Sequence, residues 1–287
     1  MISAPYLTEQ NIEHFIKNAL AEDIGDGDHS SLGSIPVNKT SKARLLIKDS
    51  GVLAGVDLAV LILKQIDQNI EIDLCKKDGE LVTNGDVGFT VKGNAQSLLS
   101  AERLLLNCMQ RMSGIATYTH KMNQLIAGTN AKLLDTRKTT PNFRLAEKWA
   151  VLIGGGVNHR YGLYDMVMLK DNHIDFAGGV KEAILSTQSY LNRKNLNLKI
   201  EVEVRDMEEL EQVIETGGVF RVLLDNMPPD QLRKGIEMVA GRMETEASGG
   251  ITEKNIRAIA ETGVDYISVG ALTHSYKSLD ISLKAYK

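Results

Sequence analysis

The stretch KIEVEVRDMEELEQVIETGGVFRVLLDN, residues 199–226, contains the unit from which the fold is built. Its two apolar segments, 199–204 and 220–225, have the length and the valine and leucine content of buried strands. Between them, residues 207–217 have the periodicity of an amphipathic helix that ends at a Gly-Gly pair. A strand, a helix and a strand joined by short loops predict neighbouring parallel strands. We therefore expect a parallel α/β sheet in this half of the chain.

The same alternation continues on both sides of this unit. Further strands are expected at residues 131–135, 165–170, 243–248 and 265–270, and further helices at 229–241 and 252–263. The segments ETGGVFRVLLDN, from residue 215, and ETGVDYISVGAL, from residue 261, repeat a helix end, a glycine turn and a buried strand. A repeat of this kind predicts a βα barrel, and an open doubly wound sheet is the alternative.

The first hundred residues have a different pattern. Residues 11–25 have helical spacing, whereas 42–55 and 70–93 have the alternation of strands joined by glycine-containing turns. These elements predict a small α+β domain. A long helical pattern over 97–128 leads out of this domain, and we expect a break in it near Ser113-Gly114.

Composition and charge exclude several classes of protein. The chain has 287 residues, of which 43% are hydrophobic and 24% charged, and this excludes a disordered or fibrous protein. The net charge of -4 gives no general attraction to nucleic acid or to an anionic membrane. Cys75 and Cys108 have neither the number nor the spacing of a disulfide framework or a metal site. No basic and apolar leader and no membrane-length apolar run is present, so we expect a cytoplasmic protein.

Polar residues or glycines follow nearly every expected strand of the second half. The positions are Arg137, Lys138, Lys170, Glu203, Asp225, Asn226, Ser248, Gly249, Gly250, Gly270 and Ala271. In a βα barrel the carboxyl ends of the strands form the active site. A charge after one strand is typical of a solvated loop, but polar residues after six strands in succession predict a functional site.

A phosphate site is expected near the end of the chain. Ser248, Gly249 and Gly250 precede a predicted helix that has Thr252 as its N-cap. Backbone N–H groups at a helix start bind phosphate when glycine lets the ligand approach. An ordinary tight turn is the alternative. Barrels, however, often bind phosphate in the loops after their last two strands, which is where these residues stand.

The candidate site is rich in cations. Five stand at or near the strand ends: Arg137, Lys138, His159, Arg160 and Lys170. Five cations repel one another in an empty cleft, which predicts a ligand with two or more anionic groups. Glu203 and Asp225 are candidates for binding Mg²⁺, for holding ribose hydroxyls or for stabilising a positive charge during reaction. The sequence has no zinc-type spacing of His, Cys and Asp, so the expected metal is a hard ion such as Mg²⁺.

The chain also resembles a known family along nearly its whole length. The motifs that carry the resemblance are EDIGDGD (22–28), ERLLLNCMQRMSGIAT (102–117), DTRKTTP (135–141), GGGVNHRYGLYD (154–165), LKDNHI (169–174), EVEV (201–204), LLDN (223–226), EASGGI (246–251) and SVGALTHS (268–275). In this order and spacing they are similar to the motifs of quinolinate phosphoribosyltransferases. Where that family commonly has glycine this chain has Asn142, which must take over the turn and tolerates positive φ better than most residues.

The resemblance implies a reaction and an architecture. The implied reaction joins quinolinate to 5-phosphoribosyl-1-pyrophosphate with Mg²⁺ and no organic cofactor, giving nicotinate mononucleotide, CO₂ and pyrophosphate for de novo NAD synthesis. The implied architecture is a type II phosphoribosyltransferase fold, with an α/β sandwich at 1–112 and an incomplete, seven-stranded type of α/β barrel at 113–274. A helix at 275–287 is expected to pack back on the sandwich. The resemblance also implies a homodimer or a higher oligomer, in which Arg103 completes the neighbouring subunit's site.

The matching motifs also assign roles to individual residues. Quinolinate binding is implied for Arg103, Thr136, Arg137, His159, Arg160 and Lys170. Phosphate binding is implied for Lys138, Ser248, Gly249, Gly250, Gly270, Ala271 and His274. Catalysis is implied for Lys138, Lys170, Glu203 and Asp225, and the two carboxylates also face the metal.

The sequence leaves three other functions open. A paralogous transferase with another acceptor and a non-catalytic phosphate-ligand barrel are the alternatives. The complete set of cations and carboxylates favours the decarboxylating enzyme over both of them. An aldolase barrel is a weaker option, because it would need a Schiff-base lysine in an apolar pocket.

Overall fold

The computed structural model describes residues 3–286, which fall into two compact units. The first unit comprises Met1–His120, Thr139–Gly155 and Ala271–Lys287, and the second comprises Lys121–Lys138 and Gly156–Gly270. The chain therefore leaves the first unit, returns to it for one segment and enters it again near the C-terminus. Residues 1, 2 and 287, at the outer ends of the expected terminal segments, lie outside the described residues.

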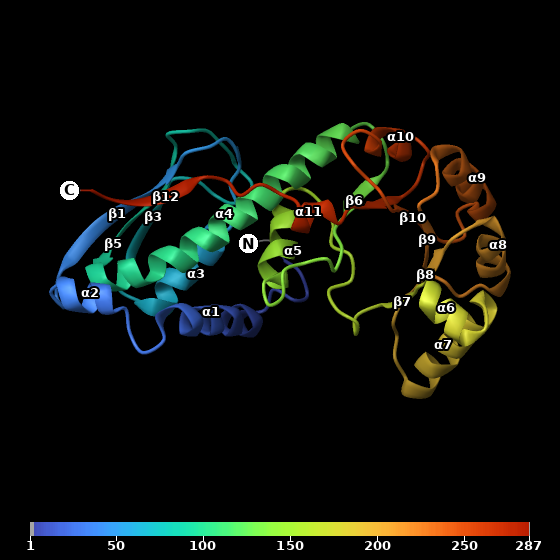
Figure 1. Cartoon of the computed structure of the whole chain (residues 1–287), viewed down its shortest axis with the longest axis horizontal. Helices are drawn as coiled ribbons and strands as arrows, with labels where there is room; N and C mark the ends of the chain where they lie inside the picture. The colour runs from blue at the N-terminus through green and yellow to red at the C-terminus, as the bar shows by residue number, and fades with distance from the viewer. Residues whose placement is uncertain (1–2, 287) are drawn as a thin grey trace. The chain divides into compact units, whose positions relative to one another are not determined.

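An antiparallel sheet forms the centre of the first unit (Figure 1). Its strands are β1 (Thr40–Ile47), β3 (Glu71–Leu74), β5 (Val87–Asn94) and β12 (Ile281–Tyr286), in the order β12-β1-β5-β3, and β2 (Gly51–Val52) pairs separately with β4 (Leu81–Val82). The helices are α1 (Glu9–Ile24), α2 (His29–Ser34), α3 (Val56–Ile66), α4 (Ala95–Leu125), α5 (Arg144–Ile153) and α11 (Ala271–His274). Helix α4 continues into the second unit. The expected α+β pattern is confirmed.

The expected C-terminal helix at 275–287 is wrong, because this segment contains strand β12. Ile281 and Leu283 are buried and alternate with less buried residues, which is the period of a strand. Strand β12 pairs antiparallel with β1, and Leu283 lies opposite Leu45. Pairing with a neighbouring strand and burial of one face decide the conformation of so short a segment.

The expected break at Ser113-Gly114 is also wrong, because α4 is one helix of 31 residues. The Ser113 hydroxyl accepts the backbone N–H of Ala54 at 2.9 Å and donates to its carbonyl oxygen at 3.1 Å. A Cβ added to Gly114 would lie 2.3 Å from the carbonyl oxygen of Lys277. The pair therefore marks a close approach of other segments to α4 and not the end of a helix.

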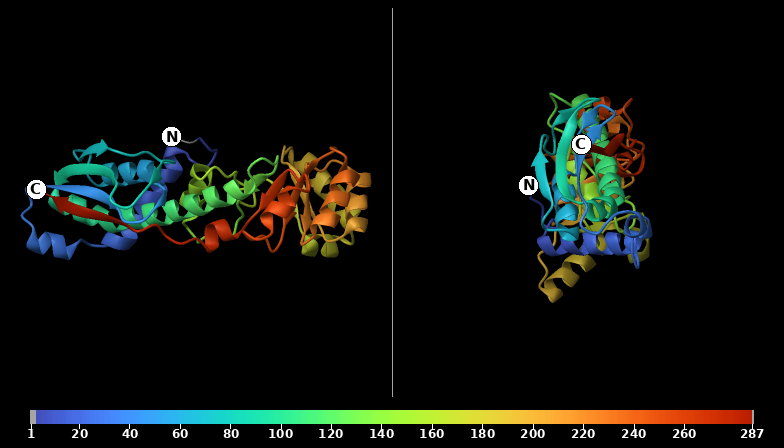
Figure 2. Two further views of the ribbon diagram at one scale, coloured as in Figure 1. Left: turned by 90° about the horizontal axis from the view of Figure 1, so that it is seen from above. Right: turned by 90° about the vertical axis from the view of Figure 1, so that its left-hand side faces the viewer.

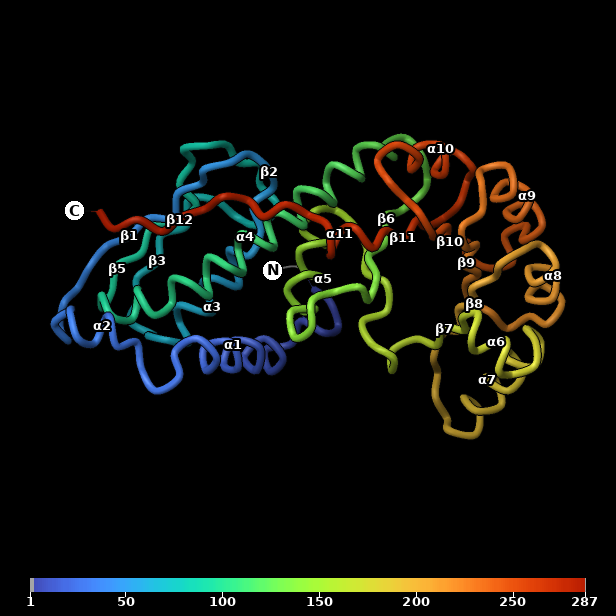
Figure 3. The backbone as a smooth tube through the Cα atoms, in the orientation of Figure 1, coloured from blue at the N-terminus to red at the C-terminus, as the bar shows by residue number. Residues whose placement is uncertain are grey.

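The second unit is built on a sheet of six parallel strands (Figure 3). They are β6 (Lys132–Leu134), β7 (Val167–Leu169), β8 (Ile200–Val204), β9 (Arg221–Asp225), β10 (Glu244–Ser248) and β11 (Tyr266–Ser268), in the order β6-β11-β10-β9-β8-β7. A parallel bridge between Leu134 and Val157 adds a further segment beside β6. Strands β6 and β7 stand at the two ends of the order, so the barrel is incomplete. The expected incomplete α/β barrel is confirmed, with six strands and the bridge at Val157 among the described residues where seven strands were expected.

Helices cover the outer face of this sheet. They are α6 (Asp171–Ala177), α7 (Val180–Lys194), α8 (Met207–Thr216), α9 (Pro229–Val239) and α10 (Ile256–Ala260), and α6 to α9 lie side by side (Figures 1 and 2). Gly235 of α9 packs on β9, since an added Cβ would lie 3.2 Å from Cδ1 of Leu224. None of the helices described in residues 3–286 combines the length and apolar character needed to cross a bilayer.

The register of the strands separates two faces of the sheet. Glu201, Arg221 and Glu244 are register partners on β8, β9 and β10. Because side chains alternate along a strand, the same face carries every second residue after them. These are Glu203, Leu223, Asp225, Glu246 and Ser248. The face opposite the helices is therefore polar and carries several of the expected site residues.

Gly114→Ala should destabilise the protein, because the new methyl group would occupy the space of a backbone carbonyl. Overpacking of this kind costs about 1 to 3 kcal/mol. Gly33→Ala is the matched control, since Gly33 also lies in a helix but, outside its own helix backbone, no atom of residues 3–286 lies within 4 Å of an added Cβ. The control should keep the stability or raise it by up to about 1 kcal/mol. Urea unfolding measures both changes, and equal stability of Gly114→Ala and the wild type would contradict the close approach.

Candidate active site

Lys170 and Glu203 meet at the carboxyl ends of two neighbouring strands. Lys170 directly follows β7, and its Nζ lies 3.1 Å from Oε2 of Glu203 on β8. The Glu203 side chain is 14% exposed and that of Lys170 is 44% exposed. The pair therefore stands at the rim of the polar face, where a ligand can reach the lysine.

The ends of β9 and β10 form a second polar group. Asp225 and Ser248 are register partners, and Asn226 links them. Its Nδ2 donates to Oδ2 of Asp225 at 2.7 Å, and its backbone N–H donates to the carbonyl oxygen of Ser248 at 2.8 Å. Gly249 has a φ of +92°, and an added Cβ would lie 2.2 Å from Oδ1 of Asn226. A side chain at position 249 would therefore displace the residue that joins the two strand ends.

The expected helix start at Thr252 is wrong, because α10 begins at Ile256 with Asn255 at its N-cap position. Thr252 instead belongs to a turn in which its backbone N–H donates to Oδ1 of Asn255 at 2.7 Å. Asn255 Nδ2 donates in turn to the carbonyl oxygen of Gly250 at 2.9 Å. A phosphate at this loop would therefore meet the backbone of a glycine turn and not the first turn of a helix.

Asp135 is fully buried and follows β6. It links the segment that carries Arg137 and Lys138 to the segment that carries His159 and Arg160. Its Oδ2 accepts from Nδ2 of Asn158 at 2.7 Å, and its Oδ1 accepts the backbone N–H of His159 at 2.8 Å. The next residue, Thr136, accepts the backbone N–H of Lys138 at 3.0 Å through its Oγ1. The segments that carry the expected cations are thus held by hydrogen bonds at their starts.

Arg137 and Arg160 interact electrostatically. Burial lowers the pKa of the Arg160 guanidinium, and the positive charge of Arg137 lowers it further, whereas nearby carboxylates oppose this shift. Nη1 of Arg160 donates to the carbonyl oxygen of Met166 at 3.2 Å, which orients the guanidinium group. A half-buried guanidinium group oriented in this way, with the half-buried Arg137 acting on it, suits a ligand with carboxylate groups, which arginine can bind in a bidentate manner.

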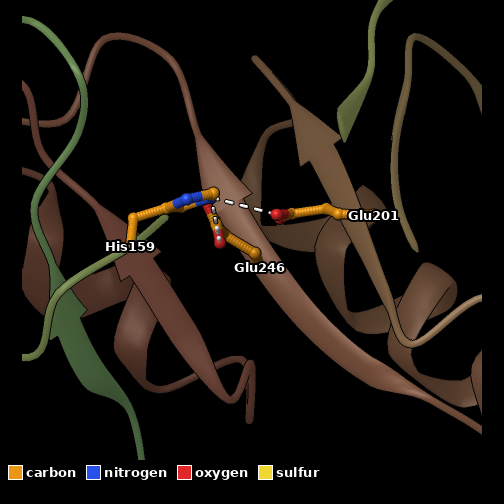
Figure 4. A group of neighbouring side chains, drawn as sticks. All are labelled: His159, Glu201 and Glu246. Atoms are coloured by element: carbon orange, nitrogen blue, oxygen red, sulfur yellow. Dashed lines mark ion pairs between the residues drawn. The ribbon is translucent and has the colours of Figure 1, made fainter. Parts of the chain in front are cut away.

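A buried cluster of His159, Glu201 and Glu246 lies on the polar face of the sheet (Figure 4). Nε2 of His159 is 3.0 Å from Oε2 of Glu201 and 3.6 Å from Oε2 of Glu246. The His159 side chain is 7% exposed, and both glutamates are fully buried. Arg221 Nη1 lies 3.1 Å from Oε2 of Glu246 and compensates part of the negative charge.

Burial has the largest effect on the protonation of both glutamates. It raises the pKa of Glu246 to about 7, and the negative charge of Glu201 adds to this shift. Burial also raises the pKa of Glu201, and the positive charge of Arg221 opposes it. One ligating atom from each of His159, Glu201 and Glu246 lies within 4.8 Å of the others, so the cluster has the spacing of a metal site as well as of a hydrogen-bonding group.

Glu201, Glu246 and Arg221 are not among the expected site residues. The signal that finds the glutamates is alternation, since Glu201 precedes Glu203 by two residues and Glu246 precedes Ser248 by two. Each glutamate therefore shares a face with an expected site residue. No sequence signal shows that His159 lies against them, because that contact depends on how the chain folds back beside β6.

Three expected site residues belong to the first unit: Arg103, Ala271 and His274. Arg103 is exposed on α4, and Ala271 is the first residue of α11. Nδ1 of His274 lies 2.7 Å from the hydroxyl oxygen of Ser275. The expected roles of these residues in quinolinate and phosphate binding stay predictions.

The loop after Lys138 is held in the first unit by a buried carboxylate that the sequence analysis missed. Oε1 of Glu147 lies 3.0 Å from Nη2 of Arg111, and its Oε2 accepts the backbone N–H of Thr140 at 3.0 Å.

The backbone at Asn142 has the left-handed conformation that glycine adopts most easily, with a φ of +61°. The expectation that Asn142 takes over a turn suited to glycine is therefore confirmed.

Comparison with known protein families gives matches along nearly the whole chain. The model of the C-terminal domain of quinolinate phosphoribosyl transferase matches residues 115–284, and that of its N-terminal domain matches residues 28–113. A chloroplastic nicotinate-nucleotide pyrophosphorylase (carboxylating) of Arabidopsis thaliana is 46% identical over 298 residues, which cover 99% of this chain and 85% of the relative. A probable nicotinate-nucleotide pyrophosphorylase (carboxylating) of Bacillus subtilis is 41% identical, over 95% of this chain and 92% of that protein.

Solved structures show the same likeness. The crystal structure of NadC from Streptococcus pyogenes superimposes with a TM-score of 0.90 at 38% identity, covering 99% of this chain and 100% of that one. The nicotinate-nucleotide pyrophosphorylase of Francisella tularensis gives a TM-score of 0.89 at 38% identity, with all of both chains covered.

The stability difference between the wild type and Glu246→Gln should depend on pH. The pKa of Glu246 is raised from 4.5 to about 7, so between these values the folded state keeps a proton that the unfolded chain has released. The contribution of Glu246 to the free energy of unfolding is therefore fully present below pH 4.5 and is lost as the pH rises to about 7, a loss of up to about 3 kcal/mol. Urea unfolding of both proteins at pH 5 and pH 8 tests this, and a difference that is the same at both values would contradict it.

Proposed function

This chain belongs to the quinolinate phosphoribosyl transferase family, and we propose that it transfers phosphoribosyl from 5-phosphoribosyl-1-pyrophosphate to quinolinate. The reaction releases pyrophosphate and CO₂ and leaves nicotinate mononucleotide for de novo NAD synthesis. The names of the relatives, nicotinate-nucleotide pyrophosphorylase (carboxylating), support both the nucleotide product and the carboxyl chemistry.

The observation that carries this proposal is the half-buried Arg160 guanidinium, which donates to the Met166 carbonyl oxygen at 3.2 Å and lies in the field of the Arg137 charge. Bringing two guanidinium groups together costs free energy unless an anion neutralises them. Quinolinate has two adjacent carboxylates on a planar ring. Each carboxylate can accept two parallel N–H hydrogen bonds from one arginine guanidinium group. We assign quinolinate to Arg137, His159, Arg160 and Lys170, with Thr136 at the start of the loop.

The remaining second-unit residues suit the phosphoribosyl donor. The 5-phosphate is assigned to the Ser248-Gly249-Gly250 turn and Gly270, and Lys138 extends from the neighbouring loop towards the phosphates. Glu203 and Asp225 lie on the polar face of neighbouring strands, where two carboxylates can stabilise a positive sugar carbon.

The order of the chemical steps follows from charge. When the bond from the sugar carbon to pyrophosphate breaks, the bonding electrons leave with pyrophosphate and an oxocarbenium-like centre forms. The lone pair of the quinolinate nitrogen then makes the new bond to that carbon and becomes a pyridinium. The positive nitrogen stabilises the carbanion that remains when the adjacent carboxylate leaves as CO₂, and a proton replaces it. Ribosylation therefore precedes decarboxylation.

Mg²⁺ fits the donor set of this site. Glu203 and Asp225 offer carboxylate oxygens, the ligands that Mg²⁺ prefers, and they share one face of the sheet. Together with oxygens of the substrate they would hold the ion, which would neutralise charge on the departing pyrophosphate. The chemistry assigned to the chain's own residues needs no organic cofactor.

The proposal includes an assembly and a location. We assign a homodimer in which Arg103 of one subunit contributes to the quinolinate site of its partner, because Arg103 is an exposed cation on α4 and the family resemblance implies that role. Sedimentation of the protein as a monomer at assay concentration would contradict the assignment.

We also expect the enzyme in the cytoplasm, which fractionation of the source cells would test.

The first experiment measures CO₂ and nicotinate mononucleotide together from quinolinate, 5-phosphoribosyl-1-pyrophosphate and Mg²⁺, with nicotinate as a parallel acceptor. We expect equal amounts of both products from quinolinate and none from nicotinate, because nicotinate lacks the second carboxylate. Turnover of nicotinate alone would instead indicate a paralogue with another acceptor. Absence of turnover by folded protein with either acceptor would favour a binding function.

Arg137→Lys should raise the KM for quinolinate by about tenfold or more, although the charge is kept, because lysine cannot donate two parallel hydrogen bonds to one carboxylate. Arg233→Lys is the matched control, since Arg233 is an exposed arginine on α9 that pairs with Asp230. Steady-state kinetics with quinolinate as the varied substrate measure both variants. Unchanged KM and kcat in Arg137→Lys would remove Arg137 from the site.

A further inference from the structure

Both ring nitrogens of His159 face protein groups. Nε2 lies 3.0 Å from Oε2 of Glu201, and Nδ1 accepts the backbone N–H of Arg160 at 2.7 Å. A nitrogen that accepts a hydrogen bond carries no proton, so the proton of the neutral ring belongs on Nε2, which faces Glu201. The imidazole is also nearly buried, at 7% exposure. His159 is therefore placed to act on its neighbours within the protein.

Glu201 is costly to keep in this position. It is fully buried, and among the described residues neither of its carboxyl oxygens receives a hydrogen bond of ordinary geometry, so its negative charge depends on nearby charges, of which Arg221 has the largest effect. Its nearest compensation is the close approach of His159 Nε2. A buried carboxyl group in such surroundings lowers stability relative to an apolar residue of similar volume. Because Glu201 lowers the stability of the fold, we expect it to have a role in the neighbouring quinolinate site.

The backbone of the same segment is fixed from a second side. Oδ1 of Asp135 accepts the backbone N–H of His159, and its Oδ2 accepts from the side chain of Asn158. Asp135 thus holds the main chain while Glu201 faces the ring. Arg160 follows directly, and its own backbone N–H is bound by the same ring. The orientation of the Arg160 backbone therefore depends on the orientation of the imidazole.

We propose that Glu201, backed by Glu246 and Arg221, is a positioning residue for the quinolinate pocket: it holds the His159 imidazole in its Nε2–H tautomer, so that Nδ1 fixes the backbone of Arg160. This inference rests on the proposed function for the identity of the ligand. Within the quinolinate site assigned above, it narrows the role of His159 to the support of Arg160, because both ring nitrogens of His159 face protein groups, while Arg137, Arg160 and Lys170 make the contacts to the substrate carboxylates.

The first test uses the free protein and needs no substrate. With ¹⁵N-labelled histidine, long-range ¹H–¹⁵N spectra distinguish the Nε2–H from the Nδ1–H tautomer, and His159→Gln identifies the signals of His159. We expect the Nε2–H tautomer in the wild type and in Glu201→Gln, because the glutamine carbonyl oxygen keeps an acceptor close to Nε2. In Glu201→Met this preference should be lost. The same tautomer in all three proteins would overturn the proposal.

The second test separates positioning from a merely structural role. Glu201→Met should raise the KM for quinolinate by about tenfold or more, with the KM for 5-phosphoribosyl-1-pyrophosphate unchanged within about twofold, and its melting temperature should stay equal or rise. Glu201→Gln should restore the KM for quinolinate to within about threefold of the wild type. A lower melting temperature with an unchanged KM in Glu201→Met would make Glu201 structural and overturn the proposal.

Glu209→Met is the matched control for the loss of a buried carboxylate in the same unit. Glu209 accepts the backbone N–H of Arg205 at 2.7 Å on the helix side of the sheet, away from the polar face. Its replacement should lower the melting temperature and leave both KM values unchanged. An increase in the KM for quinolinate in this control would show that any buried carboxylate has the effect, which would also overturn the proposal.

Two further outcomes are distinguishable. If wild-type protein binds manganese or zinc in a stoichiometric amount that survives dialysis and is lost in Glu201→Gln, the cluster is a metal site and the proposal is wrong. If the wild type turns over no quinolinate, the proposed function fails. The tautomer spectra then still decide whether Glu201 positions His159.

Discussion

The pleat of a parallel sheet forces every second residue of a strand onto one face, and the second unit depends on this constraint. Glu201 and Arg221 are register partners on adjacent strands, and Asp225 and Ser248 are partners at the next pair of strand ends. A slip of one residue in either pairing would turn these groups towards the helices and bring valines and leucines into the site. The apolar packing against the helices therefore sets the register on which the chemistry relies.

The polar face is also stabilised as a layer in its own right. Arg221 binds Glu244 at 2.7 Å and Glu246 at 3.1 Å, and its guanidinium carbon lies 4.1 Å from the centre of the Tyr266 ring. One buried cation thus forms ion pairs with two carboxylates, and its charge also acts on Glu201, which His159 approaches most closely. Removing either partner of such a layer exposes the full desolvation cost of the other, so its members act together. The carboxylates nearer the rim, which the proposed chemistry uses, stand on this layer.

Strand positions could be predicted because each strand is a short apolar run next to an amphipathic helix, a pattern confined to neighbouring residues. The features that failed depend on residues far apart in the sequence. Gly114 signals a helix break locally, but it serves the approach of Lys277. Thr252 has the chemistry of an N-cap, yet the competing bond from its backbone N–H to Asn255 delays the helix. In the candidate site, the cations could be read from composition, whereas the contact of His159 with Glu201 required the fold.

The anchoring of the cationic segments bears on how binding energy is used. Asp135 and Glu201 hold the main chain and the ring of His159 by contacts within the protein, so the orientation of Arg160 is established by groups that a ligand does not supply. A site ordered in advance loses less conformational entropy when the ligand arrives. Burial of the Arg160 guanidinium and the nearby positive charge of Arg137 both oppose the charged form of Arg160, and a dianion would offset both effects on binding. Buried carboxylates that lower stability can in this way raise affinity, because they keep two like charges together until the ligand neutralises them.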